Sequence, residues 1–218
     1  MSNCNCPANA VDEAIRIALA EDLGDGDVTC AYFVDPSQMG HARIIAKQSG
    51  VAAGTGVAVK VFRQVGPALK VEKKCGCGTR VEPGDVILEI SGPVASILSA
   101  ERVALNFLQQ LSGVATLTRR FVDAVEGTKA RILDTRKTTP GLRALEKAAV
   151  RAGGGTNHRF GLFDMALVKD NHLAARDDLD FLRRAIERLH AERPEIRVEL
   201  EADTVEQVRG FLTLPAWR

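Results

Sequence analysis

The chain has 218 residues, 45% of them hydrophobic, and its 29 Lys and Arg residues nearly balance its 28 Asp and Glu residues, for a formal net charge of +1. This length and apolar fraction can build one sizeable core or two modest ones. The near-zero charge argues against a nucleic-acid footprint and a polybasic membrane patch. No apolar run is long enough to span a bilayer and no signal peptide is evident, so we expect a cytoplasmic protein with neither nucleic acid nor membrane as partner.

The five cysteines are odd in number, which fits reduced thiols better than a disulfide framework. Cys75 and Cys77 flank a single glycine and could form half of a metal site. No further His or Cys has suitable spacing, so we interpret them as ordinary hairpin residues and assign no metal ligand to the chain.

The first half of the chain predicts strands covered by one helical layer. Residues 1–7 are expected to be a frayed tail, and the acidic, glycine-bearing run at residues 21–29 a turn. The pattern predicts helices over residues 10–20 and 56–65, strands over residues 41–50, 69–74 and 86–90, and a turn at residues 82–85. We therefore predict an α+β sandwich domain over residues 1–112.

A long helix is predicted over residues 99–125, with a break near Ser112 and Gly113. Its apolar face is made of Val103, Leu105, Phe107, Leu108 and Leu111. Arg102 lies on the same helix and, judged by the residues alone, is a surface arginine beside a carboxylate. The second predicted domain covers residues 113–218.

Three short apolar runs, at residues 131–133, 165–168 and 196–200, each pass directly into a polar cluster. Segments with the apolar spacing of helices follow these runs. Thr139 is a candidate N-cap, with Pro140 at the first position of a helix to residue 152, and Thr204 caps a later helix. Three successive βα repeats predict parallel strands with right-handed crossovers, and hence an α/β class with a partial α/β barrel.

The polar clusters share a chemical theme. Because the carboxyl ends of parallel strands meet at one edge, we expect their side chains to lie together at an active-site face. The cations are Arg136, Lys137, Arg159 and Lys169, with His158 beside them, and the carboxylates are Glu201 and Asp203. Taken singly, each could be a solvated loop residue. Taken together, they suit a polyanionic substrate and a hydroxylated or metal-bound one.

Four sequence strings now point to a family. They are Asp-Thr-Arg-Lys-Thr-Thr-Pro-Gly-Leu-Arg from Asp134, Asn-His-Arg from Asn157, Val-Lys-Asp-Asn-His from Val168 and Val-Glu-Leu-Glu from Val198. They resemble quinolinate phosphoribosyltransferase, also called carboxylating nicotinate-nucleotide pyrophosphorylase. The resemblance runs from about Val11 to Leu212, and it is specific because several separate motifs agree in order.

The resemblance implies an activity and its partners. Family members join quinolinate to phosphoribosyl pyrophosphate, releasing pyrophosphate and carbon dioxide to form nicotinate mononucleotide for NAD biosynthesis. It implies Mg²⁺ as the cofactor, bound with phosphoribosyl pyrophosphate. It also implies a homodimer in which Arg102 reaches into the active site of the neighbouring subunit.

The resemblance assigns roles residue by residue. Substrate binding falls to Arg102, Thr135, Arg136, Lys137, His158, Arg159, Lys169 and Glu201. Lys137, Lys169 and Glu201 are the predicted catalytic residues, with Glu201 on the ribose and magnesium side. We expect His158 to donate a hydrogen bond rather than act as a base, because the pyridine nitrogen that attacks already has a lone pair.

The sequence departs from the family pattern at its end, where the family continues into a further strand and glycine-rich phosphate loops. A complete barrel takes roughly 250 residues by itself. We therefore expect a C-terminally truncated product with weak or absent turnover. Two alternatives stay open: a non-catalytic remnant that binds dicarboxylates or full-length subunits, and a molybdenum-associated pyrophosphorylase relative.

Overall fold

The computed structural model describes residues 8–173 and 178–214, so the predicted tail at residues 1–7 lies outside the described residues. The chain divides into two compact units, Met1–His158 and Arg159–Arg218, each described by itself below. Both units contain helices and strands, which confirms the predicted α/β class. None of the helices in the described ranges combines the length and apolarity that a bilayer crossing requires.

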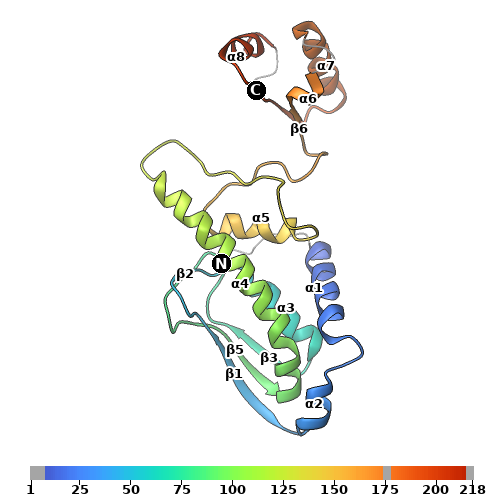
Figure 1. Ribbon diagram of the computed structural model, residues 1–218, viewed down its shortest axis with the longest axis vertical. Coiled ribbons are helices and arrows are strands. Elements are labelled where there is room, and N and C mark those ends of the chain that lie inside the picture. The colour runs from blue at the N-terminus through green and yellow to red at the C-terminus, as the bar shows by residue number, and fades with distance from the viewer. Residues whose placement is uncertain (1–7, 174–177, 215–218) are drawn as a thin grey trace. The chain divides into compact units, whose positions relative to one another are not determined.

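The first unit is built on a three-stranded antiparallel sheet (Figure 1). Its strands, in spatial order, are β1 (Met39–Ile45), β5 (Val86–Pro93) and β3 (Lys70–Lys73), and a second antiparallel pair is formed by β2 (Gly50–Val51) and β4 (Arg80–Val81). Alternation along the central strand places Leu88 and Ile90 in the core, at 0% and 2% exposure, with Glu89 on the opposite face.

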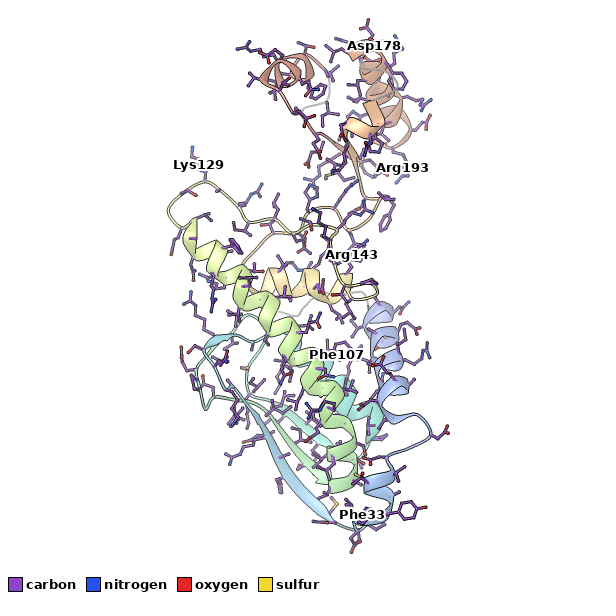
Figure 2. The ribbon with its side chains drawn as sticks, in the orientation of Figure 1. Phe33, Phe107, Lys129, Arg143, Asp178 and Arg193 are labelled. Carbon is purple, nitrogen blue, oxygen red and sulfur yellow. The ribbon has the colours of Figure 1, made fainter. Side chains whose placement is uncertain are left out.

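Helices cover one face of this sheet, as Figure 1 shows for α3 and α4. Over residues 8–158 the helices are α1 (Ala8–Leu23), α2 (Val28–Phe33), α3 (Thr55–Val65), α4 (Val94–Ala124) and α5 (Arg143–Ala152). Val61 and Phe62 of α3 share one core with Leu88 and with Phe107 of α4, which Figure 2 labels. The predicted layer of helix on sheet is therefore present.

The expected break in the long helix is wrong, because α4 runs unbroken through Ser112 and Gly113. The Oγ of Ser112 accepts the N–H of Ala53 at 3.0 Å and donates to the Ala53 carbonyl at 3.3 Å, so this serine joins α4 to the segment before α3. An interior glycine costs a helix about 1 kcal/mol relative to alanine. That cost is too small to interrupt a helix held along its length by the core.

The acidic run that was predicted to be a turn also begins a short helix, α2. Asp27 is its N-cap, and its carboxylate accepts hydrogen bonds from the Cys30 N–H at 2.9 Å and from the Ser99 hydroxyl at 2.8 Å. Hydrogen bonds from Cys30 and Ser99 lower the pKa of Asp27 from 3.8 to about 2. Asp27 thus attaches α2 to the start of α4.

The predicted start of the helix at Thr139 is also wrong, because α5 begins at Arg143. Pro140 and Gly141 instead form a turn, closed by a hydrogen bond from the Leu142 N–H to the Thr139 carbonyl at 3.0 Å. Gly141 has a φ of +79°, which is left-handed and incompatible with a continuing helix. The turn lengthens the polar loop that precedes α5.

The predicted strand at residues 131–133 is reduced to one parallel bridge between Leu133 and Thr156. Two backbone hydrogen bonds flank it, from Thr156 N–H to Ile132 at 2.8 Å and from Asp134 N–H to Thr156 at 3.2 Å. The parallel direction agrees with the prediction, but the strand was predicted too long.

The predicted domain boundary at residues 112/113 falls inside the continuous α4, whereas the compact units divide after residue 158. The reason is that α5 packs on α4 through glycines, with Gly153 against Ala115 and Thr118. Leu145 and Ala149 of α5 also enter the core of the first unit. The division into domains at 112/113 stays a prediction.

The second unit contains a parallel pair of strands, as predicted. Its elements are β6 (Met165–Val168), α6 (Asp170–Leu173), α7 (Leu179–Glu192), β7 (Arg197–Leu200) and α8 (Val205–Phe211). A small core forms around Leu182, Ile186 and Phe211. The predicted cap at Thr204 is confirmed, since its hydroxyl accepts the Gln207 N–H in a capping box.

We predict that Gly153→Ala lowers the free energy of unfolding by about 1–3 kcal/mol, a typical cost of overpacking. A Cβ at residue 153 would lie well inside van der Waals contact of the Ala115 carbonyl oxygen and 2.7 Å from the Thr118 Cβ, and the backbone oxygen cannot move away cheaply. Urea unfolding measures the change.

Gly113→Ala is the matched control, because a Cβ there meets nothing within 4 Å. It should raise stability by up to about 1 kcal/mol, since alanine is the better helix former. Equal unfolding midpoints for the two variants would contradict the packing of α5 on α4.

Candidate active site

The first predicted strand end is organised around a buried ion pair. The Nζ of Lys147 lies 2.5 Å from the Oδ1 of Asp134, and the two side chains are only 2% and 6% exposed. The same Nζ donates to the His158 carbonyl at 3.2 Å, and the same Oδ1 accepts the His158 N–H at 2.8 Å. Both sides of the His158 backbone are therefore held by the pair.

Asn157 completes this cluster. With its amide oriented to satisfy both ends, its nitrogen donates to the Oδ2 of Asp134 at 3.0 Å and to the Lys147 carbonyl at 2.9 Å, and its oxygen accepts from Arg151 at 3.1 Å. Each carboxylate oxygen of Asp134 thus has a partner, as a buried charge requires.

The sequence pattern did not predict that these two charged residues form a structural unit. Helical spacing places Lys147 about 200° from Leu145, on the face that the apolar pattern predicts to be solvated. In the structure α5 is covered on that face too, with Lys147 among its buried residues. The signal that could have found it is the Asp134 carboxylate at the end of the preceding strand, which offers a lysine on that face a partner.

The loop after Asp134 carries three predicted site residues and is held by its own hydrogen bonds. The Oγ1 of Thr135 accepts the Lys137 N–H at 3.1 Å, and the Arg136 carbonyl accepts the Thr138 N–H at 3.0 Å. Arg143 (Figure 2) donates from Nε to the Oγ1 of Thr138 at 3.1 Å. These contacts give the loop a defined backbone.

The side chains of this loop differ in exposure. Lys137 is exposed, whereas Arg136 is half-buried and its Nε is buried with no hydrogen-bond partner among the described residues. A buried guanidinium nitrogen is normally hydrogen-bonded. Arg136 therefore has donor capacity that suits a planar anion such as a carboxylate.

In the second unit, the two parallel strands place Lys169 and Glu201 side by side, each directly after its strand. The Lys169 Nζ lies 2.7 Å from the Glu201 Oε2, and the Glu201 N–H donates to the Val168 carbonyl at 2.9 Å. Their side chains are 40% and 46% exposed, so the pair contributes at most about 1 kcal/mol to stability. Either group can exchange its partner for a ligand.

Two further side chains shape the strand ends of this unit. The Nη1 of Arg159 donates to the Met165 carbonyl at 3.4 Å, and this arginine is half-buried. The Nδ1 of His172 accepts the Lys169 N–H at 2.9 Å, so this side chain helps to shape the loop after β6.

The predicted residues thus group within each unit. The first unit brings Thr135, Arg136 and Lys137 at one strand end next to His158 at the neighbouring one, with Arg102 exposed on α4. The second unit brings Lys169 and Glu201 together and carries Arg159. A common rim formed by both units stays a prediction. Among the described residues, no three His, Cys, Asp or Glu side chains are grouped as a metal site.

Two family models match this chain in succession. The quinolinate phosphoribosyl transferase N-terminal domain matches residues 27–112, and the corresponding C-terminal domain matches residues 114–216. The chain is also 42% identical over 211 residues to the nicotinate-nucleotide pyrophosphorylase (carboxylating) of Mycobacterium leprae, covering 95% of this chain and 73% of the relative. The chain belongs to the quinolinate phosphoribosyltransferase family.

Other family members agree in sequence and structure. Quinolinate phosphoribosyltransferase (decarboxylating) 2b, mitochondrial, of Nicotiana tabacum is 42% identical over 208 residues, covering 94% of this chain and 59% of the relative. The chain thus spans 59% of the length of the tobacco protein. The crystal structure of NadC from Streptococcus pyogenes superposes with a TM-score of 0.86 at 38% identity, covering 94% of this chain and 72% of that one.

A second solved structure gives the same result. The nicotinate-nucleotide pyrophosphorylase of Francisella tularensis has a TM-score of 0.87 at 34% identity, with 96% of this chain and 73% of that chain covered. The resemblance deduced from the four sequence strings is confirmed.

Proposed function

We propose that this protein transfers the phosphoribosyl group of phosphoribosyl pyrophosphate to quinolinate, with loss of carbon dioxide, to form nicotinate mononucleotide in NAD biosynthesis. The observation that carries the proposal is the set of cations after parallel strands in a chain that belongs to this family. Arg136 in particular has a buried Nε with donor capacity for a carboxylate.

Charge explains how these residues would serve the reaction. Quinolinate carries two adjacent carboxylates, and Arg136, with Arg159 and Lys169 as the further predicted contacts, would neutralise and orient them. Lys137 is exposed and would stabilise the negative charge that develops on departing pyrophosphate. As the bond to pyrophosphate breaks, the ribose carbon gains oxocarbenium character, and the pyridine nitrogen supplies its lone pair to form the new C–N bond.

The second step is the loss of carbon dioxide. The new pyridinium nitrogen draws in the electron pair left on the neighbouring ring carbon when the C–C bond to the carboxylate breaks, and that carbon then takes up a proton. The protein needs no base for the attack, so His158, whose backbone is fixed by Asp134 and Lys147, would contribute hydrogen bonds and position.

We also propose Mg²⁺ as the cofactor, entering with phosphoribosyl pyrophosphate, whose phosphates supply several of its oxygen ligands. Glu201 fits as an additional oxygen ligand or as the acceptor for a ribose hydroxyl, because its carboxylate is 46% exposed and its partner Lys169 is equally accessible. When bound, the ion would neutralise charge on pyrophosphate.

The proposal predicts that Arg136→Ala weakens quinolinate binding at least tenfold. A hydrogen bond to a charged group contributes about 1.5–3 kcal/mol, and this residue would make more than one. Isothermal titration calorimetry with quinolinate is the measurement, with circular dichroism to confirm the fold.

Arg131→Ala is the matched control, because Arg131 is an exposed arginine just before the same strand end and should leave affinity unchanged. Unchanged affinity in Arg136→Ala would contradict the carboxylate assignment. A wild-type chain that gives no heat with quinolinate would overturn the proposed substrate, whereas binding without product would favour a non-catalytic dicarboxylate binder.

We further propose a homodimer in which Arg102 reaches the neighbouring subunit. The support is its exposure on α4, whose adjacent residues Val103 and Ala104 are buried, so that Arg102 points away from the core of its own unit. Sedimentation velocity should show a species of twice the 23.5 kDa chain mass. A single monomeric species at all concentrations tested would contradict this proposal.

A further inference from the structure

The Asp134–Lys147 pair is buried more deeply than the other ion pairs described between acidic and basic side chains, most of which are at least one-third exposed on both sides. A buried pair is weak evidence for stability, because removing two charges from water costs about as much as their attraction returns. The contacts of the pair point to another purpose. Both residues bond the backbone of His158 and not only each other.

The position of these contacts in the chain shows which two segments they hold together. Asp134 directly precedes Thr135, Arg136 and Lys137, and it belongs to a different strand end from His158. Between Leu133 and Thr156 there is only one bridge, so regular sheet pairing holds these two ends weakly. The last backbone bond runs from Asp134 N–H to the Thr156 carbonyl, and the pair adds two hydrogen bonds at His158, two residues further along that strand end.

We propose that Asp134 and Lys147 are positioning residues, which hold the backbones carrying Arg136 and His158 at the spacing that two adjacent carboxylates on a pyridine ring require. This inference rests on the proposed function for the identity of the ligand. Neither residue needs to touch the substrate, because their polar atoms are occupied by each other, by His158 and by Asn157. Geometry within a few tenths of an ångström decides how well such a site binds.

The test uses the double variant Asp134→Asn/Lys147→Met in the full chain. A single substitution would leave one buried charge without its partner and could prevent folding. The double variant removes both charges and the bond from Lys147 to the His158 carbonyl, and the Met side chain fills the volume of the lysine stem. The neutral amide oxygen at residue 134 accepts the His158 N–H more weakly than the carboxylate does. Its control is Asp12→Asn/Lys60→Met, which removes an exposed pair whose side chains are 49% and 43% exposed and which lies away from the strand ends.

The first measurement is ligand-free and compares ¹H–¹⁵N amide spectra and amide hydrogen exchange. In the double variant the amides of Arg136, Thr138 and His158 should shift, and the hydrogen-bonded amides of Thr138 and His158 should exchange at least tenfold faster, while those in the middle of α4 stay unchanged. Unchanged amides in the loop would overturn the inference, whatever the substrate proves to be.

The second measurement is the ratio of affinities for quinolinate and pyridine-3,5-dicarboxylate, an isomer whose carboxylates are not adjacent. Positioning predicts that the preference for quinolinate falls at least tenfold in the Asp134/Lys147 variant and is unchanged in the Asp12/Lys60 control. A purely stabilising role predicts a lower unfolding temperature with the same preference, which would also overturn the inference.

The two proposals fail in different ways. If the wild-type chain binds neither acid but the loop amides respond as predicted, the substrate assignment is wrong and the positioning of the two strand ends stands. If the wild-type chain prefers quinolinate and the double variant keeps both that preference and its loop amides, the positioning role is wrong and the proposed function stands.

Discussion

The arrangement of the first strand end depends on one constraint, which is that the charges of Asp134 and Lys147 are buried together and must satisfy each other. Water cannot substitute for a lost partner at 6% and 2% exposure, so any movement of either side chain leaves a charge in a region of low dielectric. The remaining hydrogen bonds of the pair go to His158 and Asn157. The loop that carries Arg136 therefore begins from a fixed residue.

The second unit also pairs a lysine with a carboxylate, but there the two side chains are exposed to solvent. Lys169 and Glu201 are 40% and 46% exposed, so solvent screens their attraction and either can turn to a ligand at small cost. A buried lysine and carboxylate suit structural positioning, whereas an exposed pair after parallel strands suits contact with phosphates, ribose hydroxyls or carboxylates. Burial, and not residue type, separates the two roles.

Much of the fold could be predicted from the sequence, because short-range sequence patterns determine local secondary structure. Leu88 and Ile90 alternate with Glu89 along a strand, and Thr204 with Gln207 has the spacing of a capping box. Errors arose where tertiary contacts decide the outcome. Packing against the core keeps α4 helical through Gly113. The helical pattern predicts that Lys147 faces solvent, but in the structure its ammonium group is buried against the Asp134 carboxylate. The four sequence strings were sufficient to identify the family, since this identification depends only on residue identity and order.

We expect a dicarboxylate to bind at the strand end organised by Asp134 and Lys147. Titrating quinolinate into the isotopically labelled chain and following its backbone amides tests this claim directly. Saturable shifts are expected at Arg136, Thr138 and His158, with little change on the open face of the β1–β5–β3 sheet around His41 and Arg43. Shifts confined to that sheet face, with the strand-end amides unmoved, would contradict it.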